Sequence, residues 1–291
     1  MRDVIIALAP AAISAVVFFG TKALLMIAVC VASCVLSEFF FNLICKKAQT
    51  VGDLSAIVTG LLLALSLPAK TNLWQCVVGS VFAIVIVKCV FGGIGCNFAN
   101  PAVTARVFLL IAFSKLAGGN QTVFASAELT SSATPLEAMK NGDKLPELFD
   151  MLIGNRGGAI GETCALALIL GFVYLLIRRV ISWETPVVFV ATVFIFSLIF
   201  TTDIYLTLYH VLGGGLLIGA IFMATDYVTS PVTRRGKALF ALGCGLITVL
   251  IRFWGAYPEG VSFAILFMNI LTPFIEKWVT PRPIGGVKHE K

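Results

Sequence analysis

The sequence predicts an all-α polytopic membrane protein of about ten transmembrane helices, arranged as a 5+5 inverted repeat with a broken third helix in each half. The composition is 59% hydrophobic and only 12% charged, with a mean hydropathy of +0.99. Soluble domains carry about 25% charged residues, so a soluble fold is excluded. All but one of the apolar segments also have the roughly 17–25 residues needed to cross a hydrocarbon core of about 30 Å.

The apolar segments divide the chain into two groups around one long polar loop. They are residues 4–20, 23–45, 54–68, 73–95, 101–118, 159–177, 185–201, 204–225, 237–254 and 260–278. We therefore expect a first transmembrane repeat at 1–118, an extracytoplasmic loop at 119–158, and a second repeat with a cytoplasmic tail at 159–291. The first segment lacks a small-x-small cleavage site and leads directly into the second, which favours a retained helix over a signal peptide.

Lysine and arginine gather on one side of this arrangement. The connections on that side carry Lys46, Lys47, Arg178, Arg179, Arg234, Arg235 and Lys237. The short connections on the other side carry little beyond Lys22 and Lys70. Because cytoplasmic loops are enriched in basic residues, both termini are predicted to be cytoplasmic and the 119–158 loop to lie outside.

The third span of each half departs from an ordinary transmembrane helix. "DLSAIVTGLLLALSLPAK" is too short to cross the membrane upright, and "YHVLGGGLLIGAIFMATDYVTSP" is interrupted by the glycines at 213–215. Both stretches reach a proline, at Pro68 and Pro231. Short or interrupted spans at matching positions indicate an inverted repeat with a site near the midplane.

The loop contains "LTSSATPLEAMKNG", in which Thr134 has two readings. Thr134 as N-cap, Pro135 at the first helical position and Glu137 at the third form a capping box that opens a short helix, "PLEAMK". A cap of this kind stabilises a helix by about 1 kcal/mol and needs no chemistry. The other reading is that the hydroxyl is a point of covalent attachment, which requires a side chain that an exposed loop leaves accessible.

The segment 128–134 resembles the flavinylation motif Asp-x-x-Ser/Thr-Gly-Ala-Thr of the D subunit of the Rnf ion-translocating electron transport complex and the homologous B subunit of the sodium-translocating NADH:quinone reductase. Glu128 stands in place of the aspartate and Ser132 in place of the glycine. Three further stretches are similar to the same family: "GGIGCNFANPAVTARVF", "MATDYVTSPVT" and "YPEGVSFAILFMNILTPFIE", with Glu276 where an aspartate is commoner. The short N-terminal extension favours the Rnf type.

This resemblance implies a flavoprotein subunit that carries electrons between ferredoxin and NAD with coupled Na⁺ or H⁺ translocation. It implies FMN joined through its phosphate to Thr134 by a separate flavin transferase, with Ser131, Ser132 and Ala133 flanking the site. It also implies a second, noncovalent flavin (riboflavin), partner subunits of the A, B, C, E and G types, and the bacterial cytoplasmic (inner) membrane. Capping and attachment are compatible, since an ester oxygen keeps its lone pairs and a helix N-terminus favours phosphate.

Ionisable residues within apolar spans are costly, so they are candidate functional residues. They are Glu38, Lys88, Arg106, Glu162, Asp226 and Arg252. A flavin or phosphate contact is one hypothesis for Arg106. Asp226 is expected either to pair with Arg234 or Arg235 or to serve an ion path, and Lys88 and Glu38 either to snorkel or to pair.

Several other kinds of site are not expected. His210 has no second histidine nearby, and Cys30 and Cys34 share a helix face that suits packing better than metal ligation. The sequence has no nicotinamide-binding fingerprint and no dense cysteine motif for an iron–sulfur cluster, and its dispersed basic residues do not indicate nucleic-acid binding. No catalytic residue is therefore assigned. The alternative function is a small-solute transporter or channel of the urea or ammonium type, which would use the same broken-helix repeat.

Overall fold

The computed structural model describes residues 1–113, 134–142, 145–154, 156–255 and 259–279, which form helices and no β-strand. The first half contains α1 (Arg2–Ile44), the 3₁₀ turn η1 (Val51–Asp53), α2 (Ser55–Leu65), α3 (Leu73–Val81), the π-helix η2 (Phe82–Cys89) and α4 (Pro101–Phe113). Two short helices follow, α5 (Pro135–Asn141) and α6 (Leu148–Ile153). The second half contains α7 (Ala165–Ile177), α8 (Glu184–Thr201), α9 (Ile204–Leu212), α10 (Leu216–Ile218), the π-helix η3 (Gly219–Met223), α11 (Arg234–Trp254) and α12 (Val261–Val279).

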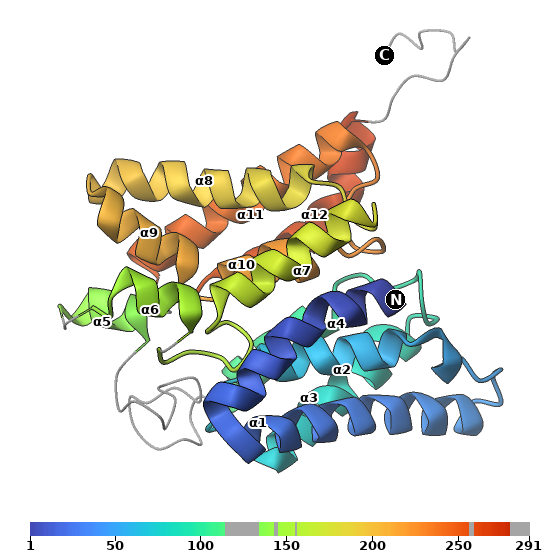
Figure 1. Ribbon diagram of the computed structural model, residues 1–291. Helices are drawn as coiled ribbons and strands as arrows, with labels where there is room; N and C mark the ends of the chain where they lie inside the picture. Colours follow the sequence, from blue (N-terminus) through green and yellow to red (C-terminus); the bar gives the residue numbers. More distant parts are fainter. Residues whose placement is uncertain (114–133, 143–144, 155, 256–258, 280–291) are drawn as a thin grey trace, which may run out of the picture.

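The helices account for every predicted span, which confirms an all-helical polytopic protein. Helix α1 contains the first two spans, and Figure 1 shows the chain reversing at its middle, where Gly20 has a φ of +65°. Among the described residues, α1, α8, α11 and α12 are each long and apolar enough to cross a membrane, and α9 with α10 and η3 forms a bent fifth candidate. The other spans fall on shorter apolar helices, so the number of crossings and the 5+5 repeat stay predictions.

Two predicted spans were too long. The helix expected over 159–177 begins only at Ala165, because the residues before it form a bridge to Pro68 and then turns. Ile160 and Gly161 donate backbone hydrogen bonds to Leu67 and Leu65 at 3.0 and 2.9 Å. The helix expected over 73–95 ends at Cys89, where the chain enters a glycine-rich turn with positive φ angles. The two halves therefore meet through irregular backbone buried within protein, which is where a membrane protein can tolerate it.

Small residues let the helices approach closely, as is usual in membranes. A Cβ on Gly60 of α2 would lie 2.8 Å from the Cα of Val31 in α1. A Cβ on Gly171 of α7 would collide with the carbonyl oxygen of Ala7. These backbone contacts join α1 to its own half through α2 and to the second half through α7.

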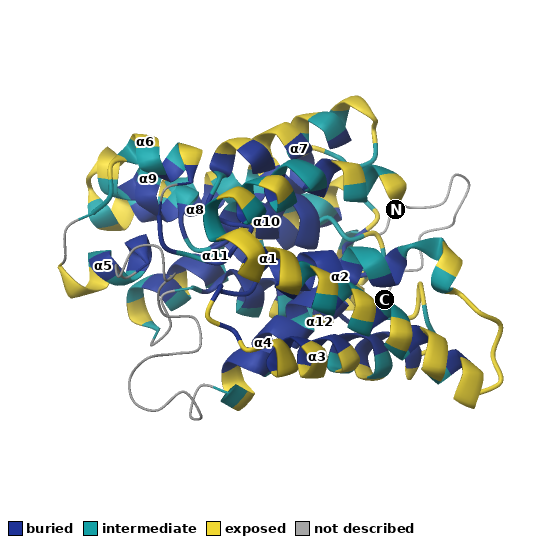
Figure 2. Ribbon diagram, turned by 60° about the horizontal axis from the view of Figure 1, so that its bottom comes forward, coloured by how far each residue is buried: buried dark blue, intermediate teal, exposed yellow. Residues whose placement is uncertain are grey.

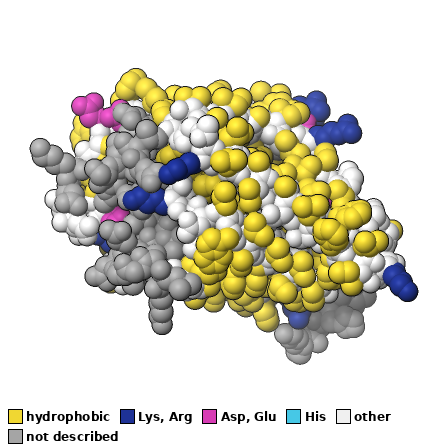
Figure 3. Space-filling view, turned by 90° about the horizontal axis from the view of Figure 1, so that it is seen from below, with side chains coloured by type: hydrophobic (Ala, Val, Ile, Leu, Met, Phe, Trp, Pro, Cys, Tyr) yellow, Lys and Arg dark blue, Asp and Glu magenta, His cyan; other side chains and the backbone are white. Residues whose placement is uncertain are grey.

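The surface has the distribution expected of a membrane-embedded chain. Figure 2 shows buried residues concentrated where the helices face one another. Figure 3 shows a broad apolar face with lysine and arginine mainly toward its two ends. Exposed apolar side chains on α1 include Ile13, Val17 and Leu36, at 64%, 73% and 53% exposure. Such an extensive apolar surface requires lipid or protein to cover it.

Candidate functional site

The predicted glycine break is present and bends one span sharply. Helix α9 ends at Leu212, residues 213–215 are irregular, and the next helical segment leaves at an angle of 57°. Gly214 and Gly215 have φ angles of +62° and +67°, in the left-handed region that favours glycine. A Cβ on Gly215 would also collide with Oε1 of Glu162. The break therefore exposes a carbonyl end of α9 and an N–H end of α10 inside the protein.

Two buried arginines satisfy the carbonyl end of α9. Arg252 donates to the carbonyls of His210, Gly213 and Gly214, the last two at 3.1 and 3.3 Å. Arg156 donates to the carbonyl of Leu212 at 2.6 Å. The last carbonyls of a helix lack partners within it and carry partial negative charge, so a guanidinium is well suited to that position. The role of Arg252 is thus to hold the break.

A third buried arginine, Arg106 of α4, lies beside the other end of the break. Its Nη2 contacts Glu162 at 3.0 Å and Glu259 at 2.5 Å. Glu162 in turn lies against Gly215, where α10 begins, and a carboxylate is favourable at a helix N-terminus. Arg106 thus joins two carboxylates from different segments, and the hypothesised contact between Arg106 and a flavin stays a prediction.

We call Arg106, Arg156, Arg252, Glu162 and Glu259 the arginine cluster. Its three arginines and two glutamates leave a formal charge of +1. In a permease of the broken-helix type the two half-helix ends are free to bind substrate or ions. Here side chains of the chain itself occupy them, which disfavours the transporter alternative at this position.

Helix α5 rests against the break, with Thr134 as its N-cap. The Thr134 hydroxyl accepts a hydrogen bond from the backbone N–H of Glu137 at 3.3 Å, as the capping prediction requires. Leu136 lies directly over Gly214, where an added Cβ would collide with its side chain. Lys140 donates to the carbonyl of Gly255 at 2.9 Å, and partial burial lowers the pKa of this lysine. Leu136 thus places α5 on the glycine break, and Lys140 joins α5 to the end of α11.

The accessibility expected of Thr134 was wrong. The residue is only 7% exposed, because α5 packs its first turn inward and buries Pro135 and Leu136 as well. Ser131, Ser132 and Ala133, expected to flank the site, lie outside the described residues.

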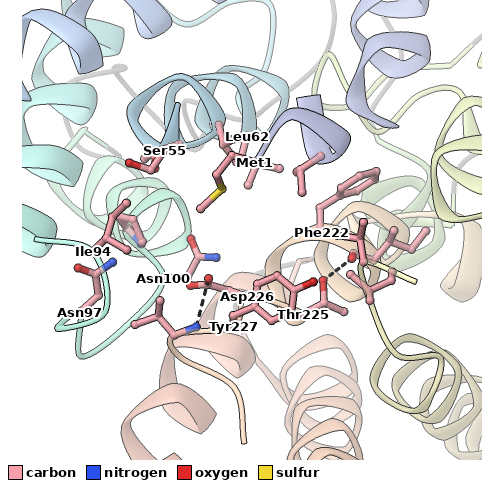
Figure 4. A pocket seen from close by; sticks show the side chains of 18 of the residues that line it. Met1, Ser55, Leu62, Ile94, Asn97, Asn100, Phe222, Thr225, Asp226 and Tyr227 are labelled. Atoms are coloured by element: carbon pink, nitrogen blue, oxygen red, sulfur yellow. Dashed lines mark hydrogen bonds between the residues drawn. The ribbon is translucent and has the colours of Figure 1, made fainter. Parts of the chain in front are cut away.

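A cavity of about 200 Å³ lies at the other end of the molecule, near Met1. Figure 4 shows Asn100 next to Asp226 on one side of the cavity, with Asn97 and Tyr227 flanking them, and Met1 with Leu62 on the opposite side. The Oδ1 atom of Asn97 is buried and has no hydrogen-bond partner within the described part of the chain. Asp226 accepts from the Thr229 hydroxyl at 3.1 Å.

Of the two roles expected for Asp226, an ion pair with an arginine is not formed among the described residues. Arg234 contacts Glu184 instead, at 3.4 Å. Asp226 faces the cavity, which leaves its role open to a ligand or an ion.

Lys88 and Glu38 form the pair that was one of their two predicted roles. Their side chains contact at 2.8 Å and are 2% and 1% exposed. Ser55 accepts from Lys88 at 2.5 Å, and Thr50 donates to Glu38 at 2.6 Å. Lys88 also lines the cavity near Met1. The pair thus lies beside the cavity near Met1.

Three other residues considered from the sequence lie in packed surroundings. The ring of His210 stacks on Phe253 at a centroid distance of 5.0 Å, and the His210 carbonyl accepts from Arg252. Cys30 and Cys34 are fully buried where α1 faces its neighbours, in keeping with the packing interpretation.

Sequence reasoning missed Arg156 and Glu259. Both lie in glycine-containing connections, "GNRGG" and "YPEGV", rather than within apolar spans. They were missed because the candidates were the ionisable residues inside the predicted apolar spans, and these two residues lie just outside them. The available signal was a charge flanked by glycine immediately before a predicted span.

Fold and site together define a class: an all-helical membrane protein whose broken helix is held by buried arginines, with a polar helix docked over the break. The chain belongs to the NQR2, RnfD, RnfE family, whose model matches residues 1–285.

Individual relatives agree with this assignment. The chain is 46% identical to the D subunit of the Na⁺-translocating ferredoxin:NAD⁺ oxidoreductase complex of Acetobacterium woodii, covering 100% of this chain and 92% of the relative. It is 40% identical to the D subunit of the proton-translocating ferredoxin:NAD⁺ oxidoreductase complex of Clostridium ljungdahlii, covering 98% and 91%. It is 38% identical to the D subunit of the ion-translocating oxidoreductase complex of Halorhodospira halophila, covering 99% and 91%.

Proposed function

We propose that this chain is the D-type subunit of an Rnf-type ferredoxin:NAD⁺ oxidoreductase and that it carries electrons through FMN linked covalently to Thr134. Full-length similarity to subunits with that name supports the complex. The position of Thr134, on a short helix docked against the broken span, supports the attachment site. The other subunits and a flavin transferase are its expected partners, and the inner membrane its location.

The hydrogen bond of Thr134 fits a phosphoester. Its Oγ1 accepts from the Glu137 N–H, and an ester oxygen can still accept that bond after the hydroxyl proton is lost. The arginine cluster, whose net charge is positive, would favour an anionic phosphate on α5 electrostatically. When bound, FMN supplies reversible electron transfer. The protein residues hold the attachment segment in place and counter the phosphate charge.

The burial of Thr134 restricts when the flavin can be attached. At 7% exposure the hydroxyl is not open to a second enzyme. We propose that the flavin transferase acts before α5 docks on the broken helix, and that docking through Leu136 and Lys140 then secures the modified segment.

The cavity near Met1 is the candidate site of the second, noncovalent flavin. The volume of this cavity is about 200 Å³. Small-molecule pockets begin at roughly 300 Å³, so the cavity would have to widen modestly to hold a flavin ring. The unpartnered Asn97 Oδ1 can accept from an imide N–H of the flavin ring. Together the two positions would place flavins at opposite ends of the molecule, within a scaffold of ten crossings in a 5+5 arrangement.

Coupling to ion export is energetically reasonable for such a carrier. Exporting one cation against about 150 mV costs roughly 3.5 kcal/mol. That equals a fall of about 150 mV for one electron. The relatives are named for Na⁺ in one case and protons in another, so similarity alone does not choose the ion.

The attachment is tested by in-gel fluorescence of the chain produced with its flavin transferase and denatured. A fluorescent band is expected for the wild type and for Thr130→Ala, and none for Thr134→Ala. A dark wild-type band, or a band that survives Thr134→Ala, would remove Thr134 as the attachment site. Thr134→Ser is expected to retain fluorescence because it keeps the hydroxyl.

A further inference from the structure

An apolar groove runs between α7, α8 and the helical segment that follows the break. It has a volume of about 560 Å³, and every residue lining it is apolar. Phe172 comes from α7, Val187 and Phe194 from α8, and Leu217 and Ile221 from the segment after the break. Figure 1 shows α7 and α8 on either side of α10. Val187 is 44% exposed, so the groove opens to the surroundings of the protein.

In the orientation that the basic connections predict, the groove lies in the inner half of the membrane. Val187 lies three residues into α8, about 5 Å from its inner end, and Phe194 lies about 15 Å from that end at 1.5 Å per residue. This length corresponds to half of a hydrocarbon core of about 30 Å. Trp183, 57% exposed just before α8, is the residue type that gathers at the membrane–water interface. The groove therefore runs from the interface toward the bilayer centre.

Basic side chains gather at the inner end of the groove. Arg178 and Arg179 follow α7, and Arg234 and Arg235 begin α11; all four are exposed. Contacts hold the two segments together: Arg234 lies 3.4 Å from Glu184, and Lys237 donates to the Ser182 hydroxyl at 2.9 Å. A site with an apolar slot below several arginines matches a molecule with a long apolar chain and an anionic head.

We propose that this groove binds an anionic phospholipid of the inner leaflet, with one acyl chain in the groove and the phosphate among Arg178, Arg179, Arg234 and Arg235. Basic pockets between transmembrane helices on the cytoplasmic side are suited to anionic headgroups. A partner helix is the competing occupant. A helix extending past the groove would desolvate four exposed arginines. Within the described part of the chain, two of them have a carboxylate partner, Asp3 for Arg178 and Glu184 for Arg234, whereas a phosphate would supply charge opposite to all four.

The head-group half of the proposal is tested with the purified complex in phosphatidylcholine vesicles that contain a minor share of phosphatidylglycerol. Retained lipids are identified by native mass spectrometry. The variant Arg179→Gln with Arg235→Gln is expected to lose phosphatidylglycerol about fivefold for each arginine removed, roughly 25-fold in total. Lys46→Gln with Lys47→Gln, at the inner end of α1 and away from the groove, is the matched control and is expected to retain it. Equal retention by both variants would overturn the proposal.

The acyl-chain half is tested by filling the groove. Ala191→Trp, at an exposed lining position, is expected to reduce retention of the lipid at least tenfold, and Ile199→Trp, 61% exposed on the same helix outside the groove, to leave it unchanged. A photo-crosslinker at Val187 gives an independent result. Crosslinks to phospholipid support the site, whereas crosslinks to another polypeptide show that a partner helix fills the groove.

Discussion

Replacing Arg252 by methionine tests how the broken helix is held together. The substitution keeps an unbranched apolar side chain but removes the donors to the carbonyls of His210, Gly213 and Gly214. Arg252 is 2% exposed, so these groups are shielded from water. A buried polar group left without its partner costs about 1–3 kcal/mol. Three carbonyls lose their donor together, so we expect a loss toward the lower end of the summed cost, roughly 3–5 kcal/mol.

The assay is the thermal unfolding midpoint of the purified protein in detergent at one fixed scan rate, since unfolding of such proteins is often irreversible. Each 1 kcal/mol corresponds to roughly 2–4 °C for a chain near this size. The expected decrease is therefore about 6–20 °C. Arg178→Met is the matched control: Arg178 contacts Asp3 at 3.2 Å but is 59% exposed, and an exposed pair contributes about 0–1 kcal/mol. Equal decreases in the two variants would refute the role given to Arg252.

Two further predictions concern buried charges. Gly215→Ala drives a Cβ into the Glu162 carboxylate, whereas Gly142→Ala, at a similar φ of +76°, meets nothing within 4 Å. Both variants place an alanine in the left-handed backbone region, which costs about 1–2 kcal/mol. Only Gly215→Ala should lower the thermal unfolding midpoint beyond that cost. Equal midpoints in the two variants would contradict the contact between Gly215 and Glu162. Lys88→Met leaves the Glu38 carboxylate buried without its ammonium, at a cost of roughly 3–5 kcal/mol. Adding Glu38→Met should restore most of the midpoint, and a double variant as unstable as the single one would show that the pair is not the cause.

Much of the fold was readable from the sequence because the membrane restricts what a chain can do. Long apolar runs must be helical in lipid, and the glycines at 213–215 correctly marked the broken span. Thr134, Pro135 and Glu137 act within one turn of chain, so the cap was also predictable. Local rules failed at 159–164, where backbone hydrogen bonds to Leu65 and Leu67 from the other half hold the chain in turns instead of a helix.

The site was less predictable because its geometry depends on distant segments. Arg106 contacts Glu162 and Glu259, which lie 56 and 153 residues further along the chain. Nothing near Arg106 in the sequence identifies either carboxylate. The inward packing that buries Thr134 likewise depends on Gly214 and Gly255, far from the loop. Sequence analysis singled out Thr134 as a candidate but did not predict its surroundings.

The most direct test of the account is an intact-mass measurement, with peptide mapping, of the chain isolated from membranes that contain its natural partners. Attachment through a phosphoester predicts an increase equal to one FMN less one water, located on the peptide that holds residues 128–140 and absent from Thr134→Ala. An unmodified mass, or an adduct located on a different side chain, would contradict the proposal that electrons pass through a flavin fixed at this threonine.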